Sequence, residues 1–111
     1  MAALSTQAIA EAGVVPSFAA AAAGGDTAVP GDKTFLVVKN GGGSSINVTL
    51  AAFPDTSTYG TAIPDPVIAV ANGAEKWIGP LRGSSYANAS TGLVNITYSA
   101  VTTVTVGVFT L

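Results

Sequence analysis

The chain has 111 residues, a length that suits one domain with one modest core. Only 9% of the residues are charged, against about 25% in ordinary soluble domains, and the net charge is −2. There is no Cys, which excludes disulfides and thiolate sites, and no His, which removes the commonest general base and metal ligand. The four basic residues are scattered, whereas nucleic-acid binding needs a clustered basic face, so no nucleic-acid partner is expected. A surface with so few charged groups has a low free-energy cost of desolvation, which favours assembly with a neighbouring subunit.

Residues 1–25 are predicted to form an N-terminal arm of small and apolar residues, followed by a domain over residues 26–111. A short helix is expected at 6–12, capped by Ser5 and closed by Gly13. Two helical turns are too few to be stable alone in water, so the apolar side chains of the arm must dock elsewhere. They pack either on this chain's own domain or across a neighbouring subunit. The candidates for that contact are Leu4, Ile9, Val14, Val15 and Phe18.

The arm matches neither a secretory signal nor a membrane span. No basic residue precedes Lys33, although a secretory signal begins with one. Glu11, Gly13 and Pro16 interrupt the hydrophobic stretch that a spanning helix would need. No membrane partner is therefore expected.

The rest of the chain is typical of short strands joined by Gly, Pro and Asn turns. Residues 34–39 are apolar on both faces, which predicts a strand in the interior of a sheet. Alternating patterns predict further strands at 46–50, 66–71, 75–78, 93–99 and 102–110. About six or seven strands, spaced by roughly ten residues, predict an all-β fold. Its expected form is an antiparallel β-sandwich or a small barrel with the arm appended.

The sequence offers no constellation for catalysis or metal binding. Asp55 and Asp65 flank a proline-containing loop, and Asp26 and Asp32 flank an earlier turn. Asp forms turns through hydrogen bonds to its own backbone, and turn formation is the interpretation adopted for these acids. Calcium needs about six to eight oxygen ligands, and its spacing of acids is missing. The serines lack a base partner. We expect no catalytic residue, no metal and no cofactor, and the chain is not expected to be an enzyme.

The chain's single Trp, Trp77, allows two interpretations. A lone Trp in a small β-domain usually fills the core. Alternatively it anchors an interface, because Trp, Tyr and Arg dominate binding hot spots. Tyr59, Arg82 and Tyr86 are the other candidates for such anchors.

Several runs of the sequence carry a family resemblance. They are QAIAEAGVVP at 7–16, GDT at 25–27, KTFLVVKNG at 33–41, WIGP at 77–80 and VNITYSAVT at 94–102. In this order they resemble the small head-decoration, or capsid-stabilising, proteins of tailed bacteriophages, of the type found in phages of actinobacteria. The order of the runs is a more specific signal than any one of them.

The resemblance implies a structural virion protein on the outer surface of the head that binds the major capsid protein and stabilises its lattice. It also implies a homotrimer, and it brings no catalytic residues or cofactor. Two alternatives remain. One is a stand-alone carbohydrate- or ligand-binding β-sandwich that uses Trp77, Tyr59 and Tyr86 as a stacking face. The other is a different minor protein of the head or tail.

Overall fold

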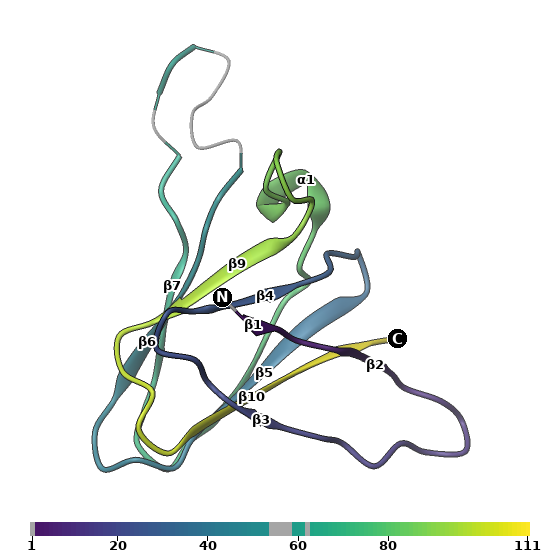
Figure 1. The fold of residues 1–111 in the computed structure, drawn as a ribbon, viewed down its shortest axis with the longest axis vertical. Coiled ribbons are helices and arrows are strands. Elements are labelled where there is room, and N and C mark those ends of the chain that lie inside the picture. Colours follow the sequence, from purple (N-terminus) through teal and green to yellow (C-terminus); the bar gives the residue numbers. More distant parts are fainter. Residues whose placement is uncertain (1, 54–58, 62) are drawn as a thin grey trace.

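The structure is a computed structural model that describes residues 2–53, 59–61 and 63–111. It is all-β, as predicted, with 41% of the described residues in strands and 4% in helix. Within the described residues the strands form two sheets, in which most neighbours are antiparallel (Figure 1). The helix α1 (Gly83–Tyr86) lies before the strand β9 (Val94–Tyr98).

Each sheet combines strands of the domain with strands of the arm. Sheet A has the order β1-β4-β9-β6-β7. Its other strands are β1 (Ala2–Ala3), β4 (Asp26–Ala28), β6 (Ile46–Leu50) and β7 (Val67–Val70). Sheet B has the order β2-β10-β5-β8, and β3 also pairs with β10. Its strands are β2 (Thr6–Ala8), β3 (Ala19–Ala20), β5 (Thr34–Asn40), β8 (Glu75–Ile78) and β10 (Val104–Thr110).

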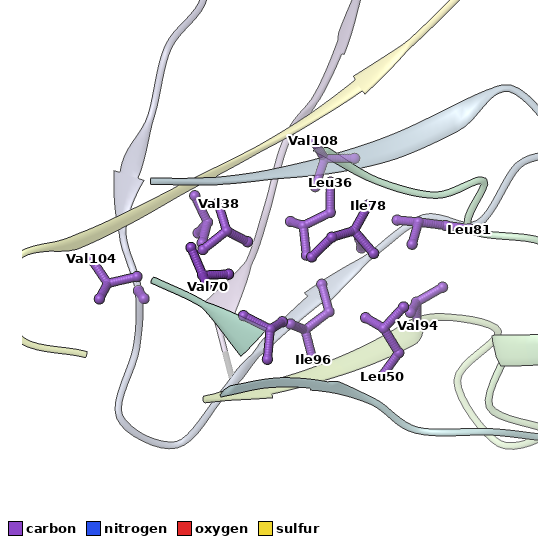
Figure 2. Close-up of a cluster of buried hydrophobic side chains, with 14 of the residues drawn as sticks. Leu36, Val38, Leu50, Val70, Ile78, Leu81, Val94, Ile96, Val104 and Val108 are labelled. Atoms are coloured by element: carbon purple, nitrogen blue, oxygen red, sulfur yellow. The ribbon is translucent and has the colours of Figure 1, made fainter. Parts of the chain in front are cut away.

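Alternate side chains of both sheets point into a common hydrophobic cluster (Figure 2). Along β6 the burial alternates as predicted, with Ile46, Val48 and Leu50 buried. The strand β5 lies between β10 and β8, and its three central residues are at most 1% exposed, so the predicted interior strand is confirmed. The cluster draws on β4, β6, β7 and β9 of sheet A and on β5, β8 and β10 of sheet B.

The predicted helix at 6–12 is wrong. Residues 6–8 form β2, which pairs in parallel with residues 108–110 of β10. Gly13 does adopt a positive φ of 88°, but it closes a turn in which its N–H bonds the carbonyl of Ala10 at 2.9 Å. Strand pairing is favoured over the helix because the edge of β10 offers hydrogen-bond partners to the backbone of residues 6–8. A two-turn helix would have no comparable contacts to stabilise it.

The arm pairs with both sheets of its own chain. Its strand β1 runs parallel to β4, while β2 and β3 both pair with β10. The loop between β2 and β3 is closed at its base by Gln7 and Ser17, whose side-chain amide and backbone exchange two hydrogen bonds of 2.8 Å. The division of the chain into an arm and a domain at residue 25 stays a prediction.

The turn predicted at Asp26 is also wrong. Asp26 lies inside β4 and is fully buried. Its Oδ2 accepts a hydrogen bond from the Tyr98 hydroxyl at 2.7 Å and one from the N–H of Ala22 at 3.3 Å. Its Oδ1 is buried and has no hydrogen-bond partner among the described residues. Burial, reinforced by the hydrogen bond to Asp26 and by its negative charge, raises the pKa of Tyr98 far above the ordinary tyrosine value.

The proline-containing loop lies only partly in the described part of the chain. Asp65 accepts a hydrogen bond from the N–H of Ala52 at 2.8 Å, which ties the end of the loop to the end of β6. Asp55 lies outside the described residues. The two acids therefore give no evidence of a shared site.

Candidate partner-binding surface

The outer face of sheet B is apolar, although it points away from the core. Alternation along β5 places Phe35, Val37 and Lys39 on the face opposite Leu36 and Val38. The register sets Phe109 of β10 beside Phe35, and Trp77 of β8 beside Val37. Three neighbouring strands therefore contribute apolar side chains to the same outer face.

These side chains form an aromatic row consisting of Phe18, Phe109, Phe35 and Trp77. Phe35 stacks on Trp77 with ring centroids 5.3 Å apart and an interplanar angle of 10°. It also stacks on Phe109 at 5.9 Å and 26°. Phe18 of the arm meets Phe109 at 5.7 Å and a tilt of 56°. Such contacts stabilise by about 0.5–1.5 kcal/mol each beyond the area they bury.

Trp77 ends the aromatic row and is 66% exposed. Its interpretation as a core residue is therefore wrong. The reason is the alternation of side chains along β8, in which Ile78 points inward and joins the hydrophobic cluster. Its neighbour Trp77 must then point outward.

The aromatic row forms the floor of a groove of about 340 Å³, which we call the Trp77 groove. One wall comes from the arm loop between β2 and β3. The groove is lined by Ile9, Val14, Pro16, Phe18, Phe35, Val37, Lys39, Glu75, Trp77 and Phe109. Its size falls within the range of about 300–1,000 Å³ typical of ligand pockets.

Gly107 of β10 makes room for the arm at this face. A Cβ on Gly107 would lie 3.0 Å from Phe109 Cε2, 3.1 Å from the carbonyl oxygen of Ser17 and 3.2 Å from Phe18 Cδ1. All three distances are tighter than ordinary van der Waals contact. The glycine therefore lets Phe18 lie directly on the sheet.

The charged and polar side chains of the groove are paired with one another. Lys39 Nζ lies 3.8 Å from Glu75 Oε1 and 3.9 Å from the centroid of the Phe18 ring. The indole N–H of Trp77 donates to Glu75 Oε2 at 2.7 Å. The ion pair is partly exposed and contributes little to stability, but it leaves the groove with no net charge.

The structure brings together some of the residues predicted to bind a partner. Ile9, Val14, Phe18 and Trp77 all line the Trp77 groove. Val15, at 90% exposed, follows Val14 on the arm loop but does not line the groove.

Other predicted contact residues lie elsewhere. Leu4 and Tyr86 are half-buried and pack against the hydrophobic cluster. Arg82 is exposed and precedes α1. Tyr59 is 95% exposed, and none of the ring contacts among the described residues joins Tyr59 or Tyr86 to Trp77.

Sequence reasoning missed several residues of the groove. They are Pro16, Phe35, Val37, Lys39, Glu75 and Phe109. The available signal was the apolar character of both faces of the 34–39 strand, which indicated a second covered face. It did not indicate that part of this face is open.

Within the described parts of the chain, no three acidic residues lie close enough together to hold a metal ion. No helix in those parts is long and apolar enough to cross a membrane. Comparison of the chain with protein-family models, curated proteins and solved structures finds no match.

Proposed function

We propose that this chain is a structural virion protein that binds the outer surface of a phage head and stabilises the lattice of the major capsid protein. The observation that carries the proposal is the aromatic row on the outer face of sheet B, which ends in Trp77 with 66% of its surface exposed. Exposed apolar surface of this kind marks interaction sites, and Trp is enriched at their centres. The low charge of the chain and the order of its decoration-type sequence runs support the same function.

In this proposal the two sheets are the layers of a β-sandwich, and a homotrimer is displayed on the head. Binding to the assembled lattice, and not to its separated subunits, stabilises the lattice by mass action. Several copies in one oligomer strengthen the attachment, because each further contact is intramolecular. No enzymatic step is required, since the work is done by binding alone.

The direct test is cosedimentation of the purified full chain with expanded phage heads that were assembled without it. The expected result is saturable binding and a higher temperature of head disruption. Tyr59→Ala is a matched control, because it removes an exposed aromatic ring that is not in the row, and it should bind like the wild type. Absence of sedimentation with the heads would contradict the proposal.

A carbohydrate-binding module is the second candidate, and the exposure of Trp77 favours it. A sugar site also needs unpaired hydrogen-bonding groups beside the aromatic platform, and those of the groove are paired with one another. A glycan array probed with the full chain separates the two functions. Selective glycan binding that Trp77→Ala abolishes, without any binding to heads, would favour the module.

A further inference from the structure

We infer that the Trp77 groove and the adjacent edge of β8 bind one extended, uncharged and apolar segment of a head protein. The inference rests on the proposed function for the source of that segment. It adds which face of this chain is used and what the partner must present there. Charge, backbone geometry and exposure in this region carry the argument.

The first step is charge complementarity. The ammonium group of Lys39 and the carboxylate of Glu75 neutralise each other, and the Trp77 N–H is already bonded to Glu75. A charged occupant would either remain unpaired in an apolar groove or have to break these contacts. Burying an unpaired charge is costly, so the complementary occupant is uncharged. The remaining lining is aliphatic and aromatic, which matches aliphatic or proline side chains.

The second step concerns the backbone of β8. In the described part of the chain, β8 ends sheet B and pairs only with β5. Asn40 donates its N–H to the carbonyl of Ala74 at 2.9 Å, and bonded pairs alternate along an antiparallel ladder. Lys76 is therefore the next bonded partner of β5. The backbone groups of Glu75 and Trp77 consequently point away from β5, toward the open edge.

The third step joins the two features. An extended segment that pairs with the free backbone groups of β8 adds a strand to sheet B. Alternate side chains of such a segment lie on the same outer face as Trp77. They would cover the indole on the side away from Phe35, which already covers one side by stacking. The required partner segment is therefore extended as well as apolar.

A pair of neighbouring valines tests the charge argument. Val14 lines the groove at 40% exposed, whereas Val15 is 90% exposed and does not line it. Val14→Asp should weaken binding to heads about tenfold or more, because it places an unpaired carboxylate in the groove. Val15→Asp introduces the same charge one residue away and should bind within about twofold of wild type. Equal binding by the two variants would overturn the inference.

Photo-crosslinking tests the edge and identifies the occupant. p-Benzoylphenylalanine is placed at Lys76 on β8 and, as a matched control, at Val67 on β7, the edge strand of sheet A. On heads, position 76 should crosslink to an extended segment without charged residues, and position 67 should not. Crosslinks from position 76 to a helix, to a charged surface or to a second copy of this chain would overturn the inference, as would no crosslink from bound protein.

These outcomes separate the two proposals. A full chain that does not sediment with heads contradicts the proposed function and removes the inference with it. A chain that sediments normally, but with equal affinity for Val14→Asp and Val15→Asp, overturns the inference alone. Circular dichroism and urea unfolding of each variant show whether its fold is retained before binding is compared.

Discussion

The two faces of sheet B are built from the same strands but meet different surroundings. On the inner face Leu36, Val38 and Val108 are fully buried against side chains of sheet A. On the outer face the arm covers only part of a surface that is apolar apart from the Lys39–Glu75 ion pair beside the aromatic row. Ordinary antiparallel sheets are polar on an uncovered face. This apolar outer face with partial cover is therefore the feature on which the proposed partner-binding surface rests.

The exposed fraction of the side chains differs between the two ends of the aromatic row. Phe109, next to Phe18 of the arm, is 5% exposed, whereas Trp77 at the far end is 66% exposed. The arm thus completes one end of the face and leaves the other open. Substitutions on the inner face should therefore lower the free energy of unfolding. Substitutions where the arm contacts the outer face should lower it less and also expose Phe18. Substitutions at Trp77 should mainly weaken binding to heads.

The largest effect is expected at the inner face. Leu36→Ala removes a fully buried side chain from the cluster and should lower the free energy of unfolding by about 3 kcal/mol. Urea denaturation of the full chain measures this. A loss below about 1 kcal/mol would mean that the two sheets do not share a packed core.

The buried contact between β4 and β9 of sheet A should follow. Tyr98→Phe removes the hydroxyl that bonds Asp26 Oδ2, leaving a buried carboxylate that already has one unpartnered oxygen. The expected loss is about 2 kcal/mol at neutral pH, the cost of an unsatisfied buried charged group. Urea denaturation at neutral pH checks it.

The pH dependence gives this prediction its control. Because the fold raises the pKa of Tyr98, the folded chain keeps a proton that the unfolded chain releases above pH of about 10. The stabilisation is complete below that pH and is lost as the pH rises, by at most about 1.4 kcal/mol per pH unit. Tyr98→Phe should lack this part of the alkaline decline. If the free energy of unfolding falls equally with rising pH in the wild type and in Tyr98→Phe, the hydrogen bond between Tyr98 and Asp26 would be contradicted.

The arm contact on the outer face comes next. Gly107→Ala should push Phe18 from the sheet and cost about 1 kcal/mol, within the lower range for overpacking. Hydroxyl-radical footprinting should show greater oxidation of Phe18. Gly43→Ala is the matched control, since a Cβ at Gly43 meets nothing within 4 Å. Unchanged footprints for both variants would show that Phe18 does not lie on Gly107.

The smallest effect on stability is expected at Trp77. Trp77→Ala removes one stacking contact at an exposed site and should lower the free energy of unfolding by about 0.5 kcal/mol, the low end of the range for aromatic pairs. The same urea denaturation checks it. A loss as large as that of Leu36→Ala would make Trp77 part of the core and remove the contrast between the two faces.

The domain strands could be predicted because their pattern is local. The alternation at Ile46, Val48 and Leu50 is visible in five residues, and the turn at Asn72 and Gly73, with Gly73 at φ 72°, coincides with an Asn-Gly pair visible in two. The arm could not be predicted in this way. Its alanines suit a helix locally, but β2 and β3 pair with residues of β10 that are 102 and 85–87 positions away in sequence, and tertiary pairing overrides local propensity.

The candidate site was predicted only in part for a similar reason. Ile9, Val14 and Phe18 were expected to dock, but the position of Phe18 on β10 depends on Gly107, whose role appears only once the strands are paired. Residue type left Trp77 with two interpretations, a core residue or an interface anchor, whereas its direction follows from the inward position of Ile78. The residue type alone could not show which way the Trp77 side chain points. The alternation of side chains along β8 places it on the outer face.

The central claim is that a head protein covers the outer face of sheet B at Trp77. Hydroxyl-radical footprinting of the wild-type chain, free and bound to heads, tests it most directly, because the chain has a single Trp. We expect rapid oxidation of Trp77 in the free chain, strong protection of Trp77 on heads and little change in the oxidation of Tyr59. Equal oxidation of Trp77 in the free and bound chain would contradict it.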